Sequence, residues 1–124
     1  MITRRQTAIA AFIGAAALVA AAPAFAHARL VSSNPVDKST VAAPKVIVLT
    51  FSAKVAPAFS GFELSMADPS HTMKVPVKTK VSRDGKTISG TPGSPLMRGA
   101  YTVKWHAASG DGHRMEGALS FNVN

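Results

Sequence analysis

The sequence contains no cysteine, which excludes both disulfide bonds and thiolate metal ligands. It is also poor in aromatic residues, which make up 6% of the chain, and in acidic residues, of which there are six against fourteen Lys and Arg. The basic residues form no run interleaved with aromatics, so a nucleic-acid groove is not expected. Single lysines spaced along the chain are typical of solvated strand faces and strand edges instead.

The first 26 residues differ in composition from the rest of the chain. An arginine pair is followed by an apolar run over residues 8–22 and then by Ala24-Phe25-Ala26, the small-x-small pattern that signal peptidase recognises. The apolar run is shorter than the roughly 20 residues of a membrane-spanning helix. We therefore expect residues 1–26 to be a signal peptide that is cleaved after Ala26. Export would use the Sec route or, with a poorer match around the arginine pair, the twin-arginine route.

The 98 residues that would remain begin at His27 and are enough for one domain with a single core. They hold all six acidic residues and twelve of the fourteen basic ones, which gives a net charge of +6. Many enzymes with an elaborate pocket are larger, so the length favours a binding domain. We expect one domain over residues 27–124, monomeric and without a membrane span after cleavage.

Apolar residues in this domain recur at strand spacing and not at helix spacing. Residues 45–51 are rich in β-branched side chains, and residues 61–66, 101–105 and 118–123 alternate apolar with polar. Turn residues separate the runs every 8–12 positions or so, and about seven short strands are predicted, as in a Greek-key β-sandwich or small barrel. The positions expected to face the core or a sheet surface are Val46, Val48, Phe62, Leu64, Tyr101, Val103, Trp105, Leu119, Phe121 and Val123.

Proline and glycine indicate two further features of this all-β pattern. Because Pro76 has no backbone N–H, the strand that contains it is expected at a sheet edge. The Arg83-Asp84-Gly85 segment predicts a hairpin turn before the strand at residues 86–89.

Four histidines lie in the predicted domain, and one of them would be its first residue. An N-terminal His27 presents both its α-amine and its ring Nδ1 to one metal ion. Nitrogen ligands together with a carboxylate favour a tetragonal Cu(II) centre over Zn or a hard cation. The ordinary alternative is that cleavage leaves a histidine at this position by chance. His106 lies beside a strand tryptophan and is expected at the surface or behind the ligands.

Asp111-Gly112-His113 supplies the other half of the ligand set. In an extended chain the side chains of Asp111 and His113 point to the same side, and Gly112 lets the backbone bend. Taken alone, these three residues would be an ordinary surface turn. Together with His27 they complete a plane of one amine, two imidazoles and one carboxylate. We therefore expect one Cu(II) ion bound by His27, Asp111 and His113.

A second candidate metal site consists of Met66, His71 and Met73. Thioether sulfur is a soft ligand that suits Cu(I). The ordinary interpretation is that Met66 continues the apolar face of its strand and fills the core. Met115 falls at a core position and Met97 in a turn, and neither is assigned to copper.

The chain resembles the CopC family of periplasmic copper-binding proteins over nearly all of residues 27–124. The similar segments are the opening His-x-x-Leu-x-x-Ser-x-Pro at 27–35, LTFS at 49–52, SPL at 94–96, GAYTVKW at 99–105, SGDGH at 109–113 and GALSF at 117–121. The resemblance implies a cupredoxin-like or immunoglobulin-like Greek-key β-barrel of seven strands. It also implies Cu(II) bound by the amine and ring of His27, by Asp111 and by His113.

Two positions depart from the family pattern. Some members have a glutamate near the copper where this chain has Ala53, and the family's proline after the second ligand histidine is Arg114 here. We expect Arg114 to affect access to the site or partner docking without changing the ligands. Some members also bind Cu(I) through a Met-rich loop, of which Met66, His71 and Met73 are a reduced version.

The resemblance implies a non-enzymatic copper carrier or buffer of the periplasm that acts in copper resistance or homeostasis. Hand-over of copper to a CopD-type inner-membrane transporter is the partner interaction that it implies. The enzyme alternative is a copper monooxygenase of the lytic polysaccharide type, which also uses an N-terminal histidine on a β-sandwich. Against it stand the short chain, the carboxylate in the ligand plane and the lack of an aromatic-rich surface. A metal-free adhesion or chaperone-like β-domain is the third alternative.

Overall fold

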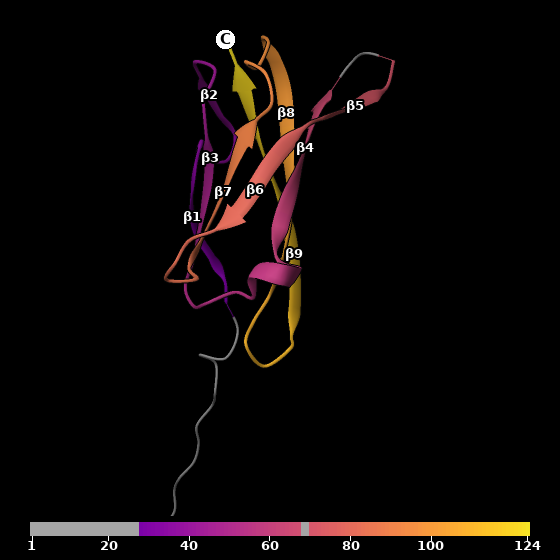
Figure 1. Ribbon diagram of the computed structural model, residues 1–124. Coiled ribbons are helices and arrows are strands. Elements are labelled where there is room, and N and C mark those ends of the chain that lie inside the picture. The colour runs from indigo at the N-terminus through magenta and orange to yellow at the C-terminus, as the bar shows by residue number, and fades with distance from the viewer. Residues whose placement is uncertain (1–27, 68–69) are drawn as a thin grey trace, which may run out of the picture.

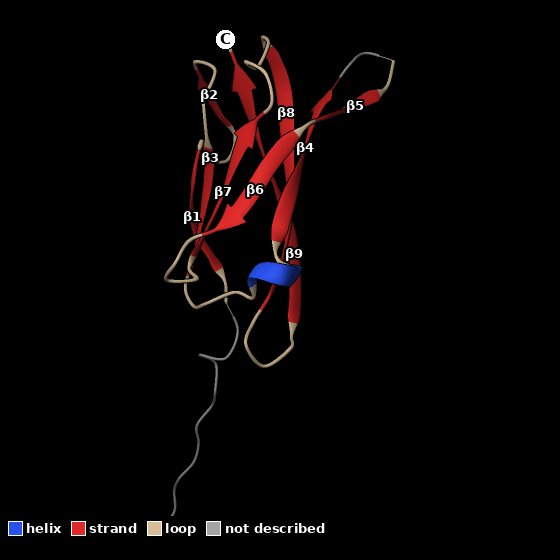
Figure 2. Cartoon of the chain, viewed as in Figure 1, coloured by secondary structure: helices blue, strands red, loops and turns tan. Residues whose placement is uncertain are grey.

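The computed structural model describes residues 28–67 and 70–124. The expected signal peptide and His27 therefore lie outside the described residues. The described part consists of nine β-strands and a single-turn 3-10 helix (Figures 1 and 2). These elements are β1 (Leu30–Asn34), β2 (Ser39–Val41), β3 (Ile47–Phe51), η2 (Pro57–Phe59), β4 (Gly61–Ala67), β5 (Thr72–Val75), β6 (Val77–Val81), β7 (Thr87–Pro92), β8 (Gly99–Ala108) and β9 (Arg114–Val123). Within the described ranges, no helix has the length and apolar character that crossing a bilayer requires.

The strands form two sheets that pack face to face (Figure 1). One sheet has the order β1-β3-β7-β6 and the other β2-β9-β8-β4-β5. Neighbours are antiparallel except β2 and β9, which run parallel. The connections cross between the sheets, so β3 pairs with β7 and β4 with β8, as in Greek-key sandwiches. The all-β sandwich prediction is confirmed, and the two sheets keep open edges and do not close into a barrel.

The described residues form nine strands, whereas the sequence pattern predicts about seven and the resemblance implies seven. β2 has only three residues, and its partner β9 is far away in the sequence. The predicted strand around Pro76 is two strands, because the chain changes sheets there: Val75 pairs with Leu64 in one sheet and Val77 pairs with Pro92 in the other. Its expected edge position is confirmed, since β5 and β6 each lie at the edge of a sheet.

The core lies between the sheets and is centred on aromatic residues of β8 and β3. The ring of Trp105 meets that of Phe51 edge to face, with 5.3 Å between centroids, and so joins the two sheets. Tyr101 stacks on Phe121 of the neighbouring strand at 5.4 Å. The core prediction is confirmed for Phe62, Leu64, Tyr101, Val103, Trp105, Leu119, Phe121 and Val123, all of which are buried.

The core face of β3 is the one opposite to Val46 and Val48. Ile47, Leu49 and Phe51 are the buried residues, whereas Val46 is 41% exposed. Apolar side chains lie on both faces of this strand, so alternation alone does not determine which face turns inward. Packing against Trp105 selects the face that carries Phe51.

The loops that surround residues 109–113 lie together at one end of the sandwich. Figure 1 shows segment 52–60 with η2, the β6–β7 turn and the β8–β9 loop together at its lower end. Ala28 is buried there, and the backbones of Arg29 and Ser52 are joined because Ser52 N donates to the Arg29 carbonyl at 2.8 Å. The described chain therefore starts at the end that holds loop 109–113.

Candidate metal centre

Loop 109–113 connects β8 to β9 and closes on itself through backbone hydrogen bonds. Ser109 N donates to the carbonyl of His113 at 2.8 Å, and Gly112 N donates to the carbonyl of Ser109 at 3.0 Å. Gly112 has a φ of 92°, a left-handed conformation that favours glycine. The bend that Gly112 makes brings the residues on either side of it together.

The side chains of Asp111 and His113 face each other. His113 Nδ1 lies 2.9 Å from Asp111 Oδ2, and His113 N donates to Asp111 Oδ1 at 3.0 Å. The carboxylate and the imidazole are therefore side by side, and an ion bound by both would replace the proton shared between Nδ1 and Oδ2. The structure thus brings Asp111 and His113 together, as their spacing in the sequence predicts.

The carboxylate of Asp111 is stabilised in its ionised form. The hydroxyl of Ser109 donates to Oδ1, and this bond is the largest cause that holds the pKa of Asp111 well below its usual range. The backbone N–H and the ring of His113 lower the pKa further, while partial desolvation opposes them. These contacts favour the ionised carboxylate, which is the form that binds a metal ion.

Ser109 is a part of this site that sequence reasoning missed. Its side chain is 3% exposed, because Ser109 forms a β-bridge with Val55 at the closed end of the core. From there its hydroxyl reaches up to Asp111. The available signal was its place in the SGDGH segment, which the family resemblance already includes.

His27 belongs to the expected ligand set and lies outside the described residues. Ala28, to which it is joined, is 1% exposed and belongs to the same core as Val55, the bridge partner of Ser109. Within residues 28–67 and 70–124, no three His, Asp or Glu side chains converge as a metal site. In the described part, loop 109–113 therefore contributes a pair of donors and not a complete set.

Three methionines, Met66, Met73 and Met97, lie together at the opposite end of the sandwich. Met66 and Met73 are directly opposite each other in the β4–β5 pair. Both line a hollow of about 310 Å³, and Met97 from the segment before β8 lines it as well. Tyr101 Oη donates to the carbonyl of Met97 at 2.6 Å and fixes that segment. Met97 was expected in a turn without a metal role, and the structure adds it to the methionine pair.

His71 stands apart from the hollow that the three methionines line. It lies just before β5 and is exposed, with Nδ1 at 3.0 Å from the hydroxyl of Ser70. Of the second predicted set, Met66 and Met73 are therefore together in the hollow, and His71 is at its outer side on the β4–β5 hairpin.

Comparison with known proteins identifies the family of the chain. The model of the CopC domain matches residues 30–124. Copper resistance protein C of Xanthomonas campestris pv. juglandis is 45% identical over 112 residues, which cover 87% of this chain and 88% of the relative. Copper resistance protein C of Pseudomonas syringae pv. tomato is 40% identical over 113 residues, with 88% and 90% covered.

A solved structure agrees with these sequence relatives. PcoC, a methionine-rich copper resistance protein from Escherichia coli, superposes with a TM-score of 0.74 at 40% identity. The match covers 80% of this chain and all of that one. The similarity therefore extends over both sheets of the sandwich.

Proposed function

Because the chain belongs to the CopC family, we propose that it is a periplasmic copper-binding protein that carries, buffers or sequesters copper and is not an enzyme. The observation that carries the proposal is the Asp111–His113 unit, in which an ionised carboxylate and an imidazole, both candidate ligands, lie 2.9 Å apart. The names of the relatives, copper resistance proteins, support copper as the cargo.

In the proposed centre, cleavage after Ala26 frees the α-amine of His27. The amine and ring of His27, the ring of His113 and the carboxylate of Asp111 then bind one Cu(II) ion. Three nitrogens and one oxygen are a donor set that suits tetragonal Cu(II). The buried Ala28 supports this arrangement, because it anchors the start of the domain at the end that holds loop 109–113.

A second site for Cu(I) is proposed at the methionine hollow. It is favoured by three thioethers, those of Met66, Met73 and Met97, which line one cavity. His71, the imidazole of the predicted set, lies on the same β4–β5 hairpin but does not line the hollow. A Cu(I) titration that compares Met97→Leu with Met115→Leu tests it, since Met115 packs against the core at a distance from the hollow.

The proposed role is transfer or storage by a monomer, with a CopD-type inner-membrane transporter as the partner. A plane of four protein ligands leaves no equatorial position for a substrate, which favours holding the ion over catalysis on it. The alternative, a copper monooxygenase of the lytic polysaccharide type, predicts peroxide-driven oxidation by the copper-bound protein. An assay of that oxidation separates the two functions.

The decisive experiment is a Cu(II) titration, followed by electron paramagnetic resonance, of two forms of the protein. One form begins at His27, and the other carries one glycine before it. We expect tight one-to-one tetragonal binding by the first form and much weaker binding by the second, because the extension removes the amine from His27. Binding should also weaken on acidification, since an α-amine with a pKa of about 7.7–8.0 must lose its proton. Equal, weak binding by both forms would contradict the proposal.

A further inference from the structure

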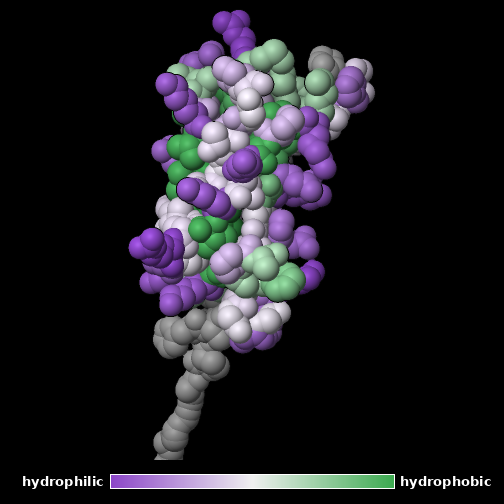
Figure 3. Space-filling view, in the orientation of Figure 1, coloured by the Kyte–Doolittle hydropathy of each residue, from purple (hydrophilic) through white to green (hydrophobic). Residues whose placement is uncertain are grey.

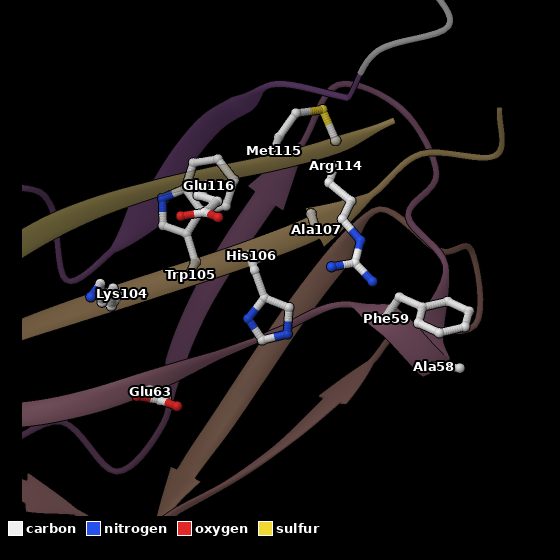
Figure 4. A pocket seen from close by; sticks show the side chains of 10 residues that line it. All are labelled: Ala58, Phe59, Glu63, Lys104, Trp105, His106, Ala107, Arg114, Met115 and Glu116. Carbon is white, nitrogen blue, oxygen red and sulfur yellow. The ribbon is translucent and has the colours of Figure 1, made fainter. Parts of the chain in front are cut away.

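A hollow of about 480 Å³ opens on the outer face of the five-stranded sheet, beside loop 109–113. Figure 4 shows the guanidinium of Arg114, the ring of His106 and the ring of Phe59 around one opening. They come from β9, β8 and η2, which follow one another around its rim. Arg114 is the next residue after His113, so one side of the hollow is built by the residue that follows the proposed copper ligand.

The aromatic side of the hollow is held in place by the end of β8. Ala56 N donates to the carbonyl of Ala108 at 2.8 Å, and Phe59 N donates to the carbonyl of Ala56 at 3.1 Å. Ala108 N in turn donates to the hydroxyl of Ser60 at 3.1 Å. Because Ala108 is also the ladder partner of Arg114, one strand end fixes both Phe59 and Arg114. Hydrogen bonds to the end of β8 therefore hold this side of the hollow in place.

Two side chains on the rim of the hollow, those of Phe59 and Arg114, are available to bind a partner. Phe59 is 60% exposed, and Arg114 forms no salt bridge with any residue in the described ranges. A guanidinium binds a carboxylate through two parallel hydrogen bonds. Exposed aromatic and arginine side chains are also the residues that contribute most to protein interfaces. The pair thus fits a ligand that combines an acidic and an apolar group.

The excess of cations at this end favours a negatively charged partner. Six exposed cations and four exposed acids lie on the loops at this end or line the hollow: Arg29, Lys54, Arg83, Lys86, Lys104, Arg114, Glu63, Asp84, Asp111 and Glu116. In Figure 3, hydrophilic side chains gather at the lower end beside the β6–β7 turn. One of the four acids, Asp111, is the proposed copper ligand. An acidic partner would be attracted to this end and held in orientation by it.

We propose that this hollow is a docking site for an acidic, aromatic-bearing segment of the protein that exchanges copper with the centre. The inference rests on the proposed function, because it assigns the surface through which the cargo moves. A concave site with Glu63 and Glu116 on its far side suits a peptide with side chains of several kinds. It suits a flat membrane surface poorly, because the site is concave. Glu63 is partly compensated by Lys74, whose Nζ lies 3.8 Å away.

The test measures binding of a labelled peptide, Gly-Asp-Phe-Glu-Gly-Asp-Phe-Glu-Gly, to the metal-free processed protein by fluorescence anisotropy. We expect binding that weakens with ionic strength and that falls at least about fivefold in Arg114→Gln and in Phe59→Ala. Lys45→Gln is the matched control, because it removes the same charge from an exposed position at the opposite end. It should leave the affinity nearly unchanged. A peptide with Asn and Gln in place of Asp and Glu should bind weakly.

Other outcomes would overturn the inference. An equal loss in Lys45→Gln would show binding by net charge alone. Binding to vesicles of phosphatidylglycerol and phosphatidylethanolamine, with none to the peptide, would assign the surface to a membrane. A Cu(II) titration of the same variants keeps the two proposals apart. Copper binding without peptide binding overturns the docking site alone, and peptide binding without copper binding overturns the proposed function alone.

Discussion

The hydroxyl of Ser109 connects the core of the sandwich to the chemistry of its exposed loop. Ser109 is buried at the start of loop 109–113, and its hydroxyl donates to the carboxylate of Asp111, which contacts the ring of His113. A metal ligand that is held in this way has lost its freedom before the ion arrives, so less of the binding free energy is spent on ordering it. The affinity of the proposed centre should therefore depend on a residue that never contacts the ion.

We predict that Ser109→Ala lowers the Cu(II) affinity by about 10- to 100-fold, the usual effect of removing a group that orients a metal ligand. The reason is that Asp111 loses the hydrogen bond that contributes most to its low pKa. Competitive titration against a chelator of known affinity measures the change. Ser120→Ala is the matched control, since Ser120 lies exposed toward the far end of β9. An unchanged affinity in Ser109→Ala would show that Asp111 needs no support.

At the scale of single residues, the sequence predicts contacts between near neighbours in the chain and misses contacts between residues that are far apart in the chain. The spacing of Asp111 and His113 is a property of three consecutive residues, so their convergence could be predicted. The burial of Ser109 depends on its bridge to Val55, more than fifty positions away. Met97 joins Met66 and Met73 only because the segment before β8 passes the β4–β5 pair. No local pattern contains either contact.

Among the elements, the β6–β7 turn has the clearest link between sequence and stability. The carboxylate of Asp84 accepts a hydrogen bond from the hydroxyl of Ser82 at 2.5 Å and one from Lys86 N at 3.0 Å. These bonds, with the Ser82 hydroxyl first, lower the pKa of Asp84 from its ordinary value of 3.8. The hairpin turn predicted from Arg83-Asp84-Gly85 is confirmed, and Gly85 adopts the positive φ of 78° that the turn requires.

We predict that Asp84→Asn destabilises the domain at neutral pH and that the difference disappears in acid. The folded pKa lies below the unfolded one, so the stabilisation is present above the ordinary value and is lost as the pH falls through the folded value. Chemical unfolding of both proteins at pH 7 and at stepwise lower pH measures this. Glu116→Gln serves as the control, because no hydrogen bond or ion pair engages that side chain in the described part. A difference that is constant with pH would contradict the assignment.

Strands were predictable where one face is clearly apolar, as in β4, β8 and β9. β3 was located correctly, but its inward face was not, because Val46 and Val48 are as apolar as Ile47 and Leu49. β2 was missed since three residues give too short a pattern and its parallel pairing with β9 is non-local. The segment around Pro76 is predicted as one edge strand. The edge position is correct for both β5 and β6, but the sequence pattern does not reveal that the chain changes sheets at Pro76.

The described part of the molecule is a sandwich whose chain starts at the same end as the β8–β9 loop. An ion bound by His27, Asp111 and His113 would join the start of the domain to its penultimate and last long strands. Such a link exists only in the folded state, because the unfolded chain does not hold these ligands together. Copper should therefore stabilise the entire domain and not the loop alone.

We predict that Cu(II) at about one hundred times the dissociation constant adds about 2.7 kcal/mol to the free energy of unfolding. For a domain of this size the midpoint of thermal unfolding should then rise by on the order of 10 °C. Calorimetry with Cu(II), and again after removal of the metal by a chelator, measures the shift and its reversal. The form with an added glycine before His27 should show a much smaller increase. An equal increase in both forms would point to copper binding elsewhere.

The length of β8 separates the two proposed copper sites, and this separation has a consequence for redox chemistry. Its ten residues separate Met97 at one end from loop 109–113 at the other, and a strand of that length spans roughly 30 Å. An ion among the thioethers and an ion among the imidazoles would share no ligand and no hydrogen bond. One molecule could then hold a reduced ion at one end and an oxidised ion at the other. Exchange between the two ends would require a second molecule, and the valence state of each ion would be set by its own ligands.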